Sequence, residues 1–106
     1  MNPPVKLSHT AALILQTISQ GYCYGFDIMD CTGLPSGTVY PALRRLEESE
    51  LVTSQWEQNA AAHKDLRPAR KYYAVSEAGE ATLEAALRRY PLLERAALDL
   101  PQKQRE

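Results

Sequence analysis

Hydroxyl-bearing and basic side chains gather in two stretches of the 106-residue sequence. The first stretch runs from residue 36 to residue 45 and contains Ser36, Thr38, Tyr40 and two arginines. The second stretch, residues 63–71, has a local charge of 4 − 1 = +3 from these residues: Lys64, Arg67, Arg70, Lys71 and Asp65. Side chains of these types donate hydrogen bonds to phosphate oxygens, so both stretches indicate phosphate-binding chemistry.

The residues that usually carry catalysis or bind metals show no supporting arrangement. Cys23 and Cys31 form no Cys-x-x-Cys pair, and His9 and His63 lie far apart. A zinc site usually needs close ligand pairs, and a nucleophile needs an orienting acid and base. We therefore expect no metal, no cofactor and no enzyme activity. The cysteines act either as packing residues or, for Cys23 in its Gly-Tyr-Cys-Tyr-Gly stretch, as a redox-sensing thiol.

The overall charge gives no support to DNA binding over the whole surface. Twelve Lys and Arg residues stand against 13 Asp and Glu residues, for a net charge of −1, so positive charge must be concentrated locally. No apolar run reaches the length of about 18 residues that a membrane span needs, and the N-terminus lacks a signal-peptide pattern. We expect one cytoplasmic domain without a membrane partner.

Apolar spacing predicts three helices in the first half of the chain. Ser8 caps a helix that ends near Gln20, and a short helix over residues 26–31 has Phe26 and Met29 on one apolar face. In the third helix, within residues 34–49, Ser36 is the expected cap and Pro41 is tolerated near the first turn. The apolar stripe of this helix is Val39, Leu43 and Leu46.

Residues 51–56 and 70–75 change to the period of two that is typical of strands, joined by a long polar connection over residues 57–69. Ser76 caps a further helix, which Pro91 interrupts before helical spacing resumes up to Leu100. This order predicts a mainly α fold with a two-stranded antiparallel β wing, which is a winged helix-turn-helix.

Four stretches of the sequence resemble the PadR-like family of bacterial transcriptional regulators. They read LILQTI (residues 13–18), YGFDIM (24–29), TGLPSGTVYPALRRLEESELV (32–52) and RKYYAVSEAGEATL (70–83). The combination of GTVYPALRRLE with the downstream RKYY is specific to the family. The resemblance implies a homodimeric repressor of palindromic promoter sites, with residues 1–75 as the DNA-binding domain and residues 76–106 as the C-terminal dimerisation helix and tail.

The sequence departs from the family pattern at three places. Glu50 stands where the family usually has a glycine in a left-handed C-cap, a substitution that costs roughly 1 kcal/mol on the same backbone. Leu66 replaces the glycine of a Gly-Arg-Pro wing, which affects the wing-tip path. Pro91 breaks what is often one long C-terminal helix, which affects the dimer geometry.

On this fold the third helix enters the major groove, and its N-terminal amides and hydroxyls suit a phosphate oxygen. The resemblance places Tyr40 and Arg44 toward DNA, where Arg44 suits a guanine edge; Tyr40 could instead pack on its neighbours. Arg45 is either a phosphate contact or a salt-bridge partner of a nearby Glu. The predicted DNA-binding residues are Ser36, Gly37, Thr38, Tyr40, Pro41, Arg44, Arg45, Lys64, Arg67, Arg70 and Lys71.

The last helical segment is the predicted dimer interface, because a domain this small leaves apolar surface for a second copy. Its candidate residues are Leu83, Ala86, Leu87, Tyr90, Leu93 and Ala97. Only Tyr90 is aromatic there, and Trp56 is interpreted as packing at the wing base, so a small-molecule inducer has little support.

A different function class remains open, namely a winged helix that binds another protein without binding DNA. The near-neutral charge and the acidic run of Glu47, Glu48 and Glu50 beside the third helix motivate this alternative.

Overall fold

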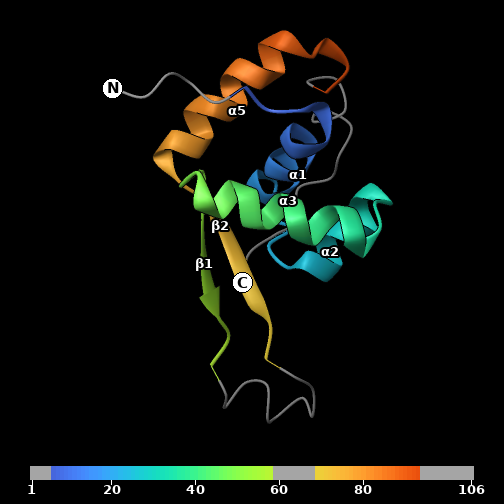
Figure 1. The fold of residues 1–106 in the computed structure, drawn as a ribbon, viewed down its shortest axis with the longest axis vertical. Helices are drawn as coiled ribbons and strands as arrows, with labels where there is room; N and C mark the ends of the chain where they lie inside the picture. Colours follow the sequence, from blue (N-terminus) through green and yellow to red (C-terminus); the bar gives the residue numbers. More distant parts are fainter. Residues whose placement is uncertain (1–5, 59–68, 94–106) are drawn as a thin grey trace.

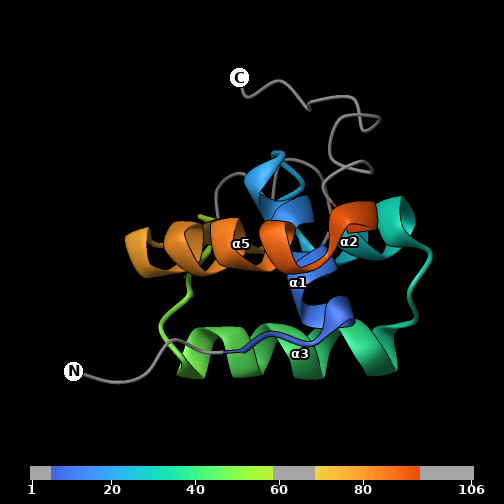
Figure 2. The same ribbon diagram turned by 90° about the horizontal axis from the view of Figure 1, so that it is seen from above.

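The computed structural model describes residues 6–58 and 69–93. In chain order its elements are α1 (His9–Ser19), α2 (Gly25–Thr32), α3 (Ser36–Glu48), β1 (Val52–Trp56), β2 (Lys71–Val75) and α5 (Glu77–Arg89). The hairpin of β1 and β2 projects from a helical body (Figure 1), and α3 runs along one side of the molecule (Figure 2). This arrangement confirms the predicted fold of helices with a two-stranded antiparallel wing.

Helix α1 is the centre of the helical body and packs against α2, α3, α5 and β2. The Ser8 hydroxyl accepts a hydrogen bond from the Ala11 amide at 3.1 Å, as predicted for an N-cap. Gly21 follows the helix with φ of 105°, a conformation that favours glycine. The predicted apolar residues Ile14, Leu15 and Ile18 are fully buried, and they give the other helices a common packing surface.

Helices α2 and α3 form the helix-turn-helix, with Gly33 in the turn at φ of 74°. The prediction that Phe26 lies on the apolar face of α2 is wrong, since its side chain is 72% exposed. The buried residues of α2 are Gly25 and Ile28, three positions apart on one face. Phe26 lies about 100° around the helix from Gly25, which turns it toward solvent.

Helix α3 shows the predicted apolar stripe, because Val39, Leu43 and Leu46 are all buried. The predicted capping role of Ser36 is wrong: Ser36 is the first residue of the helix, and Pro35 precedes it as an N-cap without a side-chain hydrogen bond. Pro35 can take this place because the proline ring fixes its φ, here −75°, close to the φ of helical residues. The first turn of α3 is therefore left without a side-chain cap.

The two strands pair in register from Val52 opposite Val75 to Trp56 opposite Lys71. The connection between α1 and α2 holds this hairpin, because the Tyr73 amide donates to the Cys23 carbonyl at 2.9 Å. Trp56 is 64% exposed, so the prediction that it packs at the wing base is wrong. Its position at the outer end of β1 carries the indole beyond the helical core.

Helix α5 returns to the core and completes it. The Ser76 hydroxyl caps it by accepting from the Gly79 amide at 3.0 Å, as predicted. The helix ends at Arg89, so Pro91 does interrupt it, and residues 91–93 are again helical. The Tyr90 hydroxyl donates to the Leu7 carbonyl at 2.9 Å, and the buried Gln16 amide donates to the Leu93 carbonyl at 2.8 Å. The first bond joins the two ends of the described chain, and the second ties its C-terminal end to α1.

Leu83, Ala86 and Leu93 belong to the same hydrophobic core as the residues of α1 and α3. The predicted division at residue 75 therefore concerns function and does not separate two cores. No helix among the described residues has the length and hydropathy that crossing a membrane requires.

Candidate nucleic-acid interface

The solvent side of α3 carries most of the residues predicted for the third helix. Ser36, Gly37, Tyr40, Arg44 and Arg45 are exposed along it. The first backbone amides of α3 with a hydrogen-bond partner are those of Thr38 and Val39, which both donate to the Pro35 carbonyl, at 2.9 and 3.0 Å. The amides of Ser36 and Gly37 come before them and meet no side-chain cap. They remain available to an anion.

Two arginines extend this surface toward the C-terminal half of α3. Arg44 and Arg45 are exposed, and neither forms an ion pair within the part of the chain that the structure describes. Arg45 was expected either to contact a phosphate or to pair with a nearby Glu, and no such pair is present among the described residues. Two exposed guanidinium groups on α3, without carboxylate partners among the described residues, are thus available to an external acceptor.

Tyr40 is held over the start of α2 by close packing on a glycine. A Cβ atom added at Gly25 would lie only 2.6 Å from Cε1 of Tyr40, so the ring occupies the space that any side chain at Gly25 would need. The ring still leaves 46% of the residue exposed. Tyr40 thus packs on a neighbour and also presents surface on the outer side, and its two interpretations are compatible.

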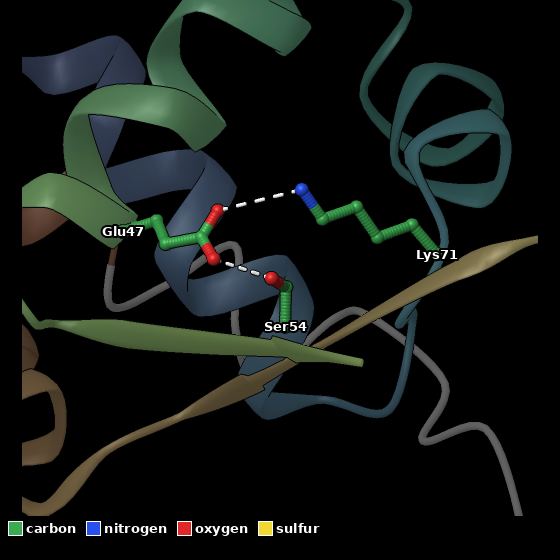
Figure 3. Close-up of polar contacts among 3 residues, drawn as sticks. All are labelled: Glu47, Ser54 and Lys71. Carbon is green, nitrogen blue, oxygen red and sulfur yellow. Dashed lines mark hydrogen bonds and ion pairs between the residues drawn. The ribbon is translucent and has the colours of Figure 1, made fainter. Parts of the chain in front are cut away.

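Glu47 joins α3 to both strands of the hairpin (Figure 3). Its Oε2 accepts a hydrogen bond from the Ser54 hydroxyl on β1, and its Oε1 lies 3.6 Å from Nζ of Lys71 on β2. The Lys71 ammonium also lies 5.8 Å from the ring centroid of Trp56 and 5.7 Å from that of Tyr73. One carboxylate therefore links the helix to both strands of the hairpin.

A second carboxylate, Glu57, ties the outer ends of the two strands together. It is only 9% exposed, and its Oε2 accepts from the Tyr72 hydroxyl at 3.1 Å. The Glu57 amide donates to the Arg70 carbonyl at 2.7 Å. Hydrogen bonding to Tyr24, then burial and Glu57, raise the pKa of Tyr72 well above its ordinary value. The phenol donates to the carboxylate at neutral pH, where a tyrosine is protonated even at its ordinary pKa of about 10.

The structure brings Tyr40, Arg70 and Lys71 together at a hollow of about 750 Å³. Trp56 and Phe26 line the same hollow but are absent from the predicted site. A second hollow of about 620 Å³ lies where α1 begins, and Gly37, Thr38, Pro41 and Arg45 line it from α3. The predicted residues of α3 thus face two sides of the helix. Lys64 and Arg67 lie outside the described residues.

Glu47 and Glu57 were not predicted as parts of the site, although both position it. The sequence alone does not show that Glu47 positions the site, because its partners Ser54 and Lys71 lie 7 and 24 residues further along the chain. Phe26 gave no sequence signal either, because it fits the helical spacing of α2, and Trp56 was interpreted as packing at the wing base.

The predicted dimer residues fall into three groups. Leu83, Ala86 and Leu93 are buried within the chain itself, and Leu87 and Tyr90 are partly buried against the same core. Ala97 lies outside the described residues. The neighbouring Leu92 is 72% exposed. Any contact with a second copy through the described residues would therefore use Leu87, Tyr90 and Leu92 more than the fully buried side chains.

Comparison with known proteins identifies relatives of this fold. Residues 14–85 match the Transcriptional regulator PadR-like family. A PadR family transcription regulator from Clostridium difficile superposes with a TM-score of 0.69 at 24% identity, covering 87% of this chain and 97% of that chain. A PadR-like transcriptional regulator from Bacillus cereus gives a TM-score of 0.61 at 25% identity, covering 89% of this chain and 92% of that chain.

BpsR from Bordetella bronchiseptica also has this fold, with a TM-score of 0.66 at 20% identity over 91% of this chain and 68% of that chain. Its DNA binding is regulated by 6-hydroxynicotinic acid. No curated protein matches the sequence.

Proposed function

The chain belongs to the PadR-like family of transcriptional regulators, and we propose that it acts as a homodimeric repressor that binds a palindromic promoter site. The observation that carries the proposal is the solvent side of α3. This surface offers uncapped amides at the helix N-terminus, the exposed ring of Tyr40 and two arginines that form no ion pair with any residue the structure describes. A major groove admits such a helix, and guanine edges suit an arginine guanidinium.

The experiment is fluorescence anisotropy with a duplex from the region upstream of its own gene, at two salt concentrations. We expect salt-sensitive binding, because contacts to phosphates release counterions. Arg44→Ala should weaken binding by about 1–3 kcal/mol, the range for losing a bidentate contact to a base. Failure of every upstream fragment to bind at low salt would contradict the proposal.

Arg88→Ala is the matched control for Arg44→Ala. Arg88 is an exposed arginine on α5 that pairs with Glu84 at 3.2 Å. Because both substitutions remove one arginine, they change the net charge of the protein equally. We expect nearly unchanged affinity for this variant. Equal losses for both variants would mean that charge alone, and not the position of Arg44 on α3, determines binding.

Dimerisation through the C-terminal segment supports the palindromic site. Two copies related by a two-fold axis present two α3 helices, which suits half-sites about one turn of DNA apart. The exposed Leu92 and the partly buried Leu87 supply apolar surface to such a contact. Light scattering should give the mass of a dimer, and Leu92→Glu should shift the equilibrium toward the monomer.

A further inference from the structure

The hollow beside α3 is lined by aromatic rings from three separate parts of the fold. Phe26 comes from the start of α2, Tyr40 from α3, and Trp56 from the end of β1. Their exposed fractions are 72%, 46% and 64%, and they include most of the large hydrophobic residues exposed in the described chain. Exposed apolar surface gathered in one place is characteristic of a binding surface.

Two cations stand at the edge of the same hollow. Cζ of Arg70 lies 4.9 Å from the ring centroid of Tyr24, and Lys71 reaches toward Trp56. Glu47 partly offsets the charge of Lys71, whereas the exposed Arg70 has no carboxylate ion pair within the described ranges. The hollow thus combines apolar walls with an uncompensated positive group. A sugar–phosphate strand has the complementary chemistry, with apolar deoxyribose faces and a negative phosphate on each nucleotide.

The position of the hollow selects which strand would meet it. Its lining residues come from the start of α2, from Tyr40 on α3 and from both strands of the hairpin. Figure 1 shows that the hairpin projects away from α2 and α3, so these residues meet where the hairpin leaves the helical body. When a helix occupies the major groove and a wing reaches the adjacent minor groove, one sugar–phosphate strand separates these two grooves. That strand has to cross the corner between helix and wing.

We propose that the hollow seats this strand, with Phe26 and Trp56 packed on deoxyribose and Arg70 bonded to a phosphate. The inference rests on the proposed DNA-binding function and adds contacts that carry no base readout. A small planar anion is the less favoured occupant, because pockets for such ligands enclose most of the ligand surface, whereas two of these rings stand more than half exposed.

The sole tryptophan of the chain makes Trp56 a direct probe, since its emission reports on this hollow alone. Titration with the upstream duplex should change Trp56 emission at the same concentrations at which anisotropy rises. Phe26→Ala and Trp56→Ala should each weaken binding about tenfold, which equals about 1.4 kcal/mol of lost apolar contact. Because no charge is removed, the slope of affinity against salt should stay the same.

Arg70→Ala should instead reduce the salt slope by about one unit, the signature of a lost phosphate contact. Thr53→Ala is the control, because Thr53 is exposed on β1 and its side chain points to the face opposite that of Ser54 and Trp56. It should bind with unchanged affinity. Circular dichroism and thermal unfolding establish that each variant is folded before its affinity is compared.

The outcomes separate this inference from the proposed function. Two results together would overturn the proposed strand-binding role of the hollow while leaving a DNA-binding regulator. These are full-affinity binding by Phe26→Ala and Trp56→Ala, and constant Trp56 emission when the wild-type protein is titrated with duplex. A wild-type protein that binds no duplex would overturn both. Quenching of Trp56 by benzoate but not by duplex would identify a ligand pocket and would also overturn the seat.

Discussion

The Glu47 side chain links α3 to both strands of the hairpin, because its carboxylate contacts Ser54 on β1 and Lys71 on β2. Glu47→Gln keeps an acceptor for Ser54 but removes the attraction to Lys71. We expect DNA affinity to fall about threefold, a modest loss that suits a partly exposed ion pair. Anisotropy with the upstream duplex measures it.

Glu48→Gln provides a sharp control because it removes the same charge from the next residue of α3, which has no ion pair within the described residues. Loss of a negative charge alone favours binding to a polyanion, so this variant should bind equally well or slightly more tightly. If Glu47→Gln behaves like Glu48→Gln, Glu47 has no positioning role.

Glu50 has the left-handed conformation that its sequence position predicts, with φ of +61°. Its carbonyl accepts from the Ser76 hydroxyl at 2.7 Å, and a glycine preserves this backbone contact. Glu50→Gly should raise the free energy of unfolding by about 1 kcal/mol, since glycine has no Cβ to strain there. Urea denaturation measures the change. Ser49→Gly, at φ of −83°, should bring no gain, and equal effects at both positions would contradict the explanation.

At the scale of elements, α5 approaches the junction of α3 and β1 through a glycine. A Cβ at Gly79 would lie 2.0 Å from the Leu51 carbonyl oxygen, which is backbone and also accepts from the Ser76 amide. Gly79→Ala should therefore destabilise the protein by about 1–3 kcal/mol, because α5 has to move outward.

Gly37→Ala is the opposite case, since nothing lies within 4 Å of a Cβ added there. Alanine favours a helix by up to about 1 kcal/mol over glycine, so this variant should be stabilised. Thermal unfolding compares the two variants. A Gly79→Ala protein as stable as the wild type would show that α5 does not pack this closely.

Helices with a clear apolar stripe and a capping residue in their sequence were predicted well. Val39, Leu43 and Leu46 are buried as their spacing indicates, and Ser8 and Ser76 cap their helices as local chemistry requires. Short elements carry less information. Helix α2 has eight residues, and nothing in its sequence distinguishes Phe26, which is exposed, from Ile28, which is buried.

The candidate site was predicted along α3 but not across to the hairpin. Contacts such as Glu47 with Lys71 join residues far apart in sequence, and their pairing depends on how the hairpin folds back. Trp56 was expected to pack at the wing base, and such packing would suit a residue type that is highly buried on average. The end of a projecting strand offers it too few neighbours for that.

At the scale of the whole molecule, a net charge of −1 sets how the protein meets DNA. The long-range field does not attract a polyanion, so affinity depends on contacts made at α3 and the hairpin. We expect a random duplex to bind much more weakly than the operator even at low salt. Competition anisotropy with unrelated duplex measures the ratio, and equal affinity for both duplexes would contradict this expectation.

The Glu47 link has a consequence for the thermodynamics of recognition. Because Glu47 contacts both strands without any duplex present, we expect part of the cost of ordering the hairpin relative to α3 to fall on folding and not on association. Because α3 and the hairpin are held at a fixed separation, the protein should also favour duplexes whose groove spacing already matches that separation. Operators that differ only in flexibility between the contacted bases should then differ in affinity.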